Sequence, residues 1–172
     1  MAMWIPPLLR RFVRSERGVA LVEFAIVLPL LMLLFAVTIE GGRMMWSYQT
    51  VIAGVREATR QVSRMVPTDI CPSSLPASGT YNALVARLVR ESTSGATVLP
   101  AQVRLDPNAP QPVTADFTCV SGSFRLPSTP RVTVSAQVRI DFPFQGIFAF
   151  VADGIDPFIV TTISDQSRVF GS

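Results

Sequence analysis

The sequence predicts an α+β fold in which one long N-terminal helix, whose first half spans a membrane, packs on a small antiparallel sheet. Three observations support this prediction. Residues 19–39 are almost continuously apolar, residues 44–65 place apolar side chains at helical spacing, and residues 131–142 alternate strictly between apolar and polar. The helix and the sheet each have one apolar face, and these two faces can cover one another.

The composition favours a membrane-resident chain. Of the 172 residues, 49% are hydrophobic and only 16% are charged, which is too apolar for a disordered chain. The length allows one modest domain beside a membrane segment. The net charge of +3 does not indicate nucleic-acid binding, because no basic patch with interleaved aromatic residues is present. Four arginines instead precede the apolar run and predict a cytoplasmic N-terminus: Arg10, Arg11, Arg14 and Arg17.

Residues 1–18 form a short basic leader, and residues 19–39 form the predicted transmembrane helix. At a rise of ~1.5 Å per residue, this run is about 31 Å long and matches the hydrocarbon core of a bilayer. Pro29 lies inside the run and is expected to kink it locally. A cleaved secretory signal is the alternative. Against it, the run is long for a signal, contains Glu23, and is followed by no clear small-x-small cleavage site.

Residues 40–66 are expected to continue as an amphipathic helix after a polar, flexible break at residues 40–43 (EGGR). Arg56, Arg60 and Arg64 occupy one side of this helix, and Pro67 ends it. The expected apolar stripe consists of Met44, Tyr48, Val51, Ile52, Val55, Ala58, Val62 and Met65.

Residues 67–172 are expected to form an extracytoplasmic α+β domain. Residues 68–80 are rich in Pro, Ser and Gly and indicate a loop, and residues 81–91 have the spacing of a short helix. Residues 144–151 fit either a helix lying on the sheet or a loop at the membrane surface. The predicted strands are residues 101–105, 113–119, 131–142 and 159–163.

The two cysteines, Cys71 and Cys119, both follow the apolar run. Both should therefore face an oxidising compartment if that run spans the membrane, and a disulfide between them is expected. Closing a loop of this size would stabilise the domain by roughly 2–4 kcal/mol. Two buried free thiols are the alternative.

The boundary between the leader and the apolar run is the most informative stretch. The basic leader ends in Gly18, the apolar helix begins at Val19, and Glu23 lies five residues past the glycine. Glycine lets a backbone approach a catalytic site closely. An unpaired carboxylate in an apolar helix is costly, so Glu23 needs a partner. An ordinary N-terminal anchor with a juxtamembrane glutamate is the alternative interpretation.

This boundary resembles the prepilin processing site of type IV pilin-like proteins. Residues 16–30 (ERGVALVEFAIVLPL), 40–43 (EGGR) and 55–60 (VREATR) are similar to the TadE-like family, and Phe24 after the glutamate fits the same pattern. The resemblance implies a pilin-like fold and a role as a minor pilin or pseudopilin of the tight adherence (Tad) pilus, without cofactor or metal. The sister TadF- and TadG-like classes share this N-terminal pattern, so the choice among them stays open.

The resemblance also implies partners and a location. A prepilin peptidase would cut after Gly18 on the cytoplasmic side, so that Val19 becomes the N-terminus. Glu23 and Phe24 would then act in assembly, with Glu23 pairing with the new amine of a neighbouring subunit. The implied partners are that peptidase, other pilin or pseudopilin subunits, inner-membrane pilus assembly proteins and membrane lipid. The implied location is the bacterial inner membrane, with the C-terminal domain periplasmic, or the pilus itself.

An enzymatic function is not expected. The chain has no histidine, which removes His-based triads and His metal ligands. The sequence also lacks a nucleophile–base pair and a Gly-rich phosphate loop. Asp153 and Asp156 flank a glycine and fit a turn better than an acid–base pair. The alternative function that stays open is a membrane-anchored extracytoplasmic binding module with no filament role.

Overall fold

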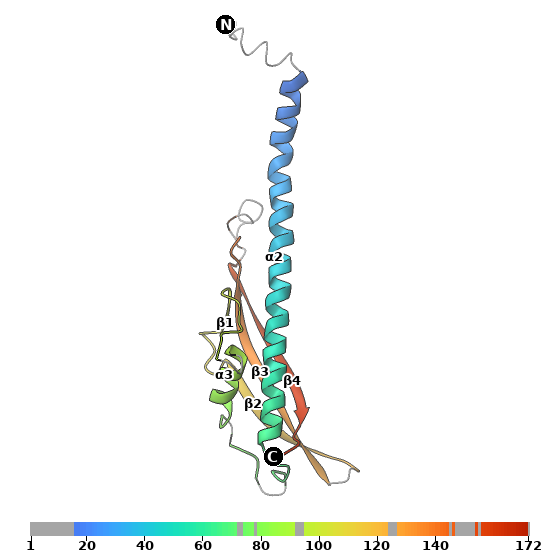
Figure 1. Ribbon diagram of the computed structural model, residues 1–172, viewed down its shortest axis with the longest axis vertical. Coiled ribbons are helices and arrows are strands. Elements are labelled where there is room, and N and C mark those ends of the chain that lie inside the picture. The colour runs from blue at the N-terminus through green and yellow to red at the C-terminus, as the bar shows by residue number, and fades with distance from the viewer. Residues whose placement is uncertain are drawn as a thin grey trace.

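The computed structural model describes residues 16–71, 74–77, 79–91, 95–123, 127–144, 146, 154 and 156–171. It shows one very long helix with a small antiparallel sheet packed beside its C-terminal half (Figure 1). The predicted α+β fold is therefore confirmed. Most of the leader, including Arg10, Arg11 and Arg14, lies outside the described residues, as do Asp153 and most of the apolar segment 144–151.

Helix α2 (Glu16–Met65) is unbroken over 50 residues and passes through Pro29. The flexible break expected at residues 40–43 is wrong, because Gly41 and Gly42 are both helical. Each glycine costs a helix only about 1 kcal/mol relative to alanine. The residues on either side, Glu40 and Arg43, pack inward and hold the helix in place: Glu40 is buried and Arg43 is half-buried.

The sheet is built around the long strand β3 (Ser128–Asp141). Strands β2 (Val113–Ser121) and β1 (Val103–Leu105) pair with one edge of β3, and β4 (Phe158–Arg168) pairs with the other. All three pairings are antiparallel. Each strand that the period-two pattern predicted is present in the described residues.

Strand β4 is longer than the predicted strand at residues 159–163. The sequence pattern missed its second half because that half carries polar residues on both faces of the sheet. Antiparallel pairing continues there regardless, from Asp141 opposite Phe158 to Arg131 opposite Arg168. An antiparallel edge strand with solvated side chains gives no apolar alternation to detect.

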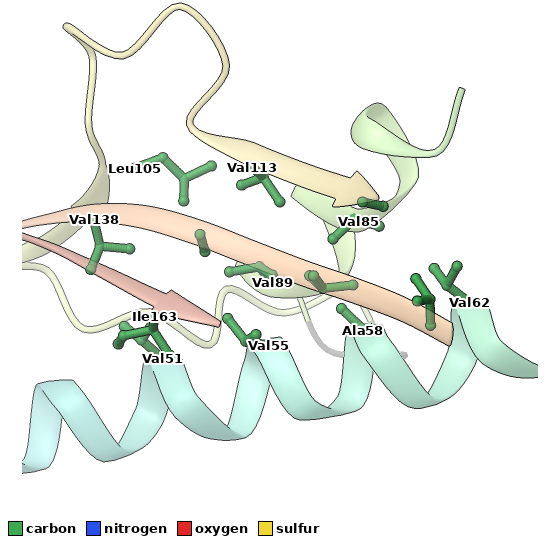
Figure 2. Close-up of a cluster of buried hydrophobic side chains, with 14 of the residues drawn as sticks. Val51, Val55, Ala58, Val62, Val85, Val89, Leu105, Val113, Val138 and Ile163 are labelled. Carbon is green, nitrogen blue, oxygen red and sulfur yellow. The ribbon is translucent and has the colours of Figure 1, made fainter. Parts of the chain in front are cut away.

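Helix α2 and the short helix α3 (Asn82–Arg90) cover one face of the sheet, with α2 over β3 and β4 and α3 over β2. The residues between these layers form one apolar cluster, most of it valine (Figure 2). Branched side chains suit the pleated sheet surface, and burying each one contributes about 1.5–3 kcal/mol. The contributions of α2 are Val51, Val55, Ala58 and Val62, and those of β3 are Val132, Val134, Ala136, Val138 and Ile140.

The buried face of α2 differs from the predicted stripe. Met44, Tyr48 and Met65 are exposed, whereas Ser47 and Thr59 are buried. These hydroxyls are satisfied inside the helix, because Thr59 Oγ1 donates to the Val55 carbonyl at 2.8 Å and Ser47 Oγ donates to the Arg43 carbonyl at 2.8 Å. A hydroxyl bonded to the preceding turn can face a core without a lost hydrogen bond.

The expected disulfide is present. Cys71, in the turn after α2, is bonded to Cys119 on β2, with Cα atoms 5.8 Å apart. The bond closes a loop with a sequence separation of 48. It ties the end of the long helix to the edge of the sheet far from the free half of α2.

Candidate membrane and assembly site

Within the part of the chain that the structure describes, helix α3 and the strands lie beside the second half of α2 and not beside its first half (Figure 1). Among the described residues, α2 is the one helix long and apolar enough to cross a membrane. Its most apolar window has a mean hydropathy of 2.6, and only 6% of that window is buried. An exposed apolar surface of this size is unstable in water, so the helix fits a membrane anchor.

The predicted processing and assembly residues all lie in the first turns of this exposed helix: Gly18, Val19, Glu23 and Phe24. Val19 and Glu23 are separated by four residues, so they lie on the same face one turn apart. Both side chains, and that of Phe24, are exposed. Val19 and Glu23 therefore lie side by side on one surface of the helix, away from the folded domain, and Gly18 and Phe24 lie in the same turns but on other sides of the helix.

Glu23 makes no hydrogen bond or ion pair with any residue that the structure describes. It is a single carboxylate on an otherwise apolar surface, since residues 19–22 and 24–37 carry no charge. A carboxylate in that position needs a cationic or hydrogen-bonding partner from outside the chain. The arrangement can thus pair a charge between molecules within or beside a membrane.

A second feature lies in the folded domain, between α2 and β4. It is an open cavity of about 520 Å³. Its lining residues are Arg56, Arg60, Arg64, Asp165, Gln166, Ser167 and Phe170. The three arginines form the ridge predicted from the sequence, and we call this feature the arginine groove. Arg60 reaches Glu57 at 3.9 Å, and both side chains are largely exposed, so the pair contributes little.

The arginine groove has an excess of positive charge, because its lining has three arginines and one aspartate. No cluster of three or more His, Cys, Asp or Glu side chains occurs in the part of the chain that the structure describes. The nearest hydroxyl, that of Ser167, bonds to the carbonyl of Arg168 at 3.2 Å. This hydroxyl thus donates its hydrogen bond to a backbone carbonyl and not to a side chain that could activate it.

A third feature lies where the free half of α2 meets the domain. Gln102 Nε2 donates to Ser47 Oγ at 3.0 Å. Burial raises the pKa of the Glu40 carboxyl above its ordinary value, while Arg43 and the backbone of Phe144 act in the opposite direction. Among the described residues, Glu40 Oε2 is buried without a hydrogen-bond partner. The Arg43 guanidinium lies 6.0 Å from the centre of the Phe144 ring. The sequence pattern does not show this junction, because the glycines at residues 40–43 (EGGR) favour a flexible break. The polarity of Glu40 and Arg43 within an apolar run was the available signal.

Most of α2, from its start into the part that packs on the sheet, is similar to a known protein family. Residues 18–60 match the model of the TadE-like protein family, which confirms the resemblance found in the sequence. The match begins at Gly18 and covers a quarter of the chain, so α3, the sheet and the disulfide lie beyond it. No curated protein and no solved structure matches the chain. Over residues 18–60 the chain is similar to TadE-like proteins.

Proposed function

We propose that this TadE-like chain is a minor pilin or pseudopilin that supports the assembly of a Tad-type pilus and adhesion. One observation carries the proposal: Glu23 is exposed and unpaired, within the described residues, on an apolar helix whose family match begins at Gly18. A helix with this surface cannot remain in water, and its carboxylate needs a partner outside the chain.

Processing after Gly18 by a prepilin peptidase is the first part of the proposal. The basic leader holds the N-terminus in the cytoplasm, and glycine allows the peptidase to approach the backbone. Cleavage would leave Val19 as the first residue, and its amine would be largely protonated at neutral pH. That cation would lie at the edge of an apolar helix, one turn from Glu23.

Assembly through Glu23 is the second part. A charge of either sign costs about 2.5–3.5 kcal/mol at the centre of a membrane, and less near its surface. Two subunits reduce this cost when the amine of one lies against the carboxylate of the other. Such pairing favours a single staggered register between neighbouring apolar helices, and Phe24 would pack beside the pair.

The location follows from the same features. We place the chain in a bacterial inner membrane, with the leader (residues 1–18) cytoplasmic and the domain (residues 67–172) periplasmic. Residues 19–39 span the membrane, and residues 40–66 carry the helix into the domain. The disulfide between Cys71 and Cys119 supports this orientation, because disulfides persist in the periplasm and are rare in the cytoplasm.

The proposed partners are the prepilin peptidase, other pilin or pseudopilin subunits, inner-membrane pilus assembly proteins and membrane lipid. The proposed role is structural, in line with the association of TadE-like proteins with the pilus. The chain would act by pairing with other subunits and not by catalysis.

A substitution at Glu23 tests the proposal. Full-length Glu23→Ala should insert in the membrane as the unmodified chain does but fail to enter or support the pilus. Glu57→Ala is the matched control, because Glu57 is also an exposed glutamate on α2 but lies in the half that packs on the sheet. Glu23→Gln keeps the size of the side chain and removes its charge. Normal piliation in Glu23→Ala would contradict the assembly role.

The arginine groove supports a second candidate function, an anchored extracytoplasmic binding module with no filament role. Its three arginines face one acidic side chain of the lining, Asp165, so the groove has an excess of positive charge and suits an anionic partner. Under this alternative, Arg60→Ala would reduce surface adhesion while Glu23→Ala leaves both piliation and adhesion unchanged. Loss of piliation in Glu23→Ala together with unchanged adhesion in Arg60→Ala supports the pilin role.

A further inference from the structure

For about two turns beyond the predicted span, α2 carries polar side chains on the side facing the domain and apolar side chains on the outward side. On the side facing the domain, Glu40 and Ser47 are 6% and 0% exposed. On the outward side, Met45 and Trp46 are 61% and 66% exposed. A helix that packs on a domain in water shows the opposite arrangement, with apolar side chains inside and polar ones outside. The outward medium at this level is therefore not expected to be water.

The outward face changes character further along the same helix. At 100° per residue, Gln49 and Glu57 project from the same side of α2 as Met45 and Trp46. All four side chains are exposed, so burial in the domain does not explain the difference between them. The change from apolar to polar falls between Trp46 and Gln49. It marks the level at which the surroundings of the helix become aqueous.

The length of the helix agrees with this level. From Val19 to Trp46 the axis rises about 40 Å at ~1.5 Å per residue. The hydrocarbon core of a bilayer is ~30 Å thick, and the two headgroup layers bring the total to ~40–45 Å. Trp46 therefore lies in the outer headgroup layer when Val19 lies in the inner one. Tryptophan is enriched in that layer because its ring is amphipathic.

The end of the sheet that contains Asp141 and Phe158 lies at the level of Trp46 along the helix axis. The backbone N–H of Asp141 donates to the Gln102 carbonyl at 2.9 Å, and the Gln102 side chain bonds to Ser47 at 3.0 Å. Asp141 lies opposite Phe158, the first residue of β4. The next two residues of β4 are apolar and exposed, Ile159 at 43% and Val160 at 38%. Figure 1 shows this end of β3 and β4 beside the middle of α2.

We propose that, on the side of the folded domain, the boundary between the bilayer and water lies at Trp46. The end of the domain closest to the span then sits in the headgroup layer of a phospholipid bilayer. We define the membrane-proximal rim as Met45, Trp46, Ile159 and Val160. The rim continues the apolar surface of the proposed transmembrane helix, so its contact with lipid follows from that anchor. The proposal thus rests on the membrane anchoring in the proposed function and adds a lipid-contacting surface to the folded domain.

The charges at this end suit phospholipid headgroups. Arg104 and Arg139 both contact one carboxylate, that of Asp141, at 3.1 Å and 2.8 Å. The Arg139 guanidinium also lies 3.5 Å from the centre of the Phe158 ring. Together with Arg43, three guanidinium groups lie near the rim against the carboxylates of Glu40 and Asp141. Guanidinium groups donate readily to phosphate oxygens.

Depth-dependent quenching of tryptophan fluorescence tests the proposal. The full chain is reconstituted in vesicles whose acyl chains are brominated near the glycerol end or near the methyl end, with Trp4→Phe in every variant. The lead variant keeps the native Trp46. Two controls carry Trp46→Phe with a single tryptophan elsewhere: Phe35→Trp, about 16 Å along the helix axis into the span, and Phe170→Trp at the far end of the domain. Phe35 and Phe170 are both exposed.

The expected result is that Trp46 loses emission with shallow bromines more than with deep ones. Phe35→Trp should be quenched by deep bromines, and Phe170→Trp should be quenched only by aqueous acrylamide. If Trp46 is quenched only by acrylamide, as Phe170→Trp is, the proposal is overturned. The membrane anchor still stands in that case when Phe35→Trp is quenched by deep bromines. Trp46 protected from both lipid and acrylamide would also overturn the proposal, because a second protein surface then covers the rim. An unquenched Phe35→Trp would instead contradict the membrane anchor itself.

Discussion

Gln102 donates a hydrogen bond from Nε2 to Oγ of Ser47 at 3.0 Å, and this bond joins the segment before β1 to the middle of α2. Ser47 Oγ in turn donates to the Arg43 carbonyl at 2.8 Å, so the completely buried hydroxyl both donates and accepts a hydrogen bond. The bond lies at the junction between the free and the packed half of the helix. It therefore helps fix how far from the span the domain begins.

Ser47→Ala should destabilise this junction. The substitution leaves the Gln102 amide without its acceptor, which costs about 1–3 kcal/mol when the group stays buried. Because Gln102 is half-buried, we expect the lower end of that range. Thr50→Ala is the matched control, since Thr50 Oγ1 bonds only to the Trp46 carbonyl at the exposed surface. Thermal unfolding of the full chain in nanodiscs measures the stability of both variants. Equal transition temperatures for Ser47→Ala and Thr50→Ala would contradict a stabilising role of the Ser47–Gln102 hydrogen bond.

Gly54→Val should separate α2 from α3. A Cβ atom at Gly54 would lie 3.2 Å from the carbonyl oxygen of Val89 and 3.6 Å from its Cα atom. The further methyl groups of valine have no space there, and overpacking of this kind costs about 1–3 kcal/mol. The same unfolding measurement should show a lower transition temperature than that of the unmodified chain.

Gly41→Ala is the control for Gly54→Val and carries its own expectation. Apart from the neighbouring backbone of the helix itself, no heavy atom of the described residues lies within 4 Å of a Cβ placed at Gly41. The substitution should therefore stabilise the helix by about 0.5–1 kcal/mol, because alanine loses less backbone entropy than glycine. A destabilised Gly41→Ala would mean that the helix bends or is contacted at this position in the membrane.

Loss of the disulfide should weaken the domain without releasing the anchor. Replacing Cys71 and Cys119 together by serine removes a constraint worth roughly 2–4 kcal/mol for a loop of this length. The unfolding transition should fall while the chain still fractionates with membranes. Alkylation supplies the chemical check: the mass of the unmodified chain should not change unless reductant is added first. Two alkyl groups added without reductant would contradict the bond.

Much of the architecture could be predicted because it depends on local periodicity. Strand β3 alternates without error and lies in the centre of the sheet, where every second side chain is buried. In helix α3, the spacing of Leu84 and Leu88 predicts the helix; these two side chains are half-buried, and Val85 and Val89 next to them are fully buried. For both elements the burial pattern and the sequence pattern have the same period, so the local signal and the tertiary packing agree.

The errors arose where burial did not follow polarity. Ser47, Thr59 and Ser63 enter the packed face of α2 because their hydroxyls bond to carbonyls in the preceding turn, which no apolar pattern shows. The helix persists through Gly41 and Gly42 because the long-range packing of Glu40 and Arg43 outweighs the local preference of glycine. The arginine ridge was visible in the sequence, but the groove beneath it depends on β4, which lies about a hundred residues away.

The site residues at the start of α2 could be proposed from sequence because their chemistry depends on their positions at one boundary. Gly18, Val19 and Glu23 need no partner from the rest of the chain to be recognised. The junction at Ser47 and Gln102 is different, because it joins residues 55 positions apart through a register that only the folded sheet defines.

The most direct test of the central claim is the intact mass and N-terminal sequence of the chain isolated from membranes, with and without the prepilin peptidase. The account predicts a chain that begins at Val19 when the peptidase is present and retains residues 1–18 when it is absent. A chain that keeps its leader in both cases would contradict processing and leave an anchored domain. A chain that begins beyond Ile39 in both cases would contradict the anchor as well.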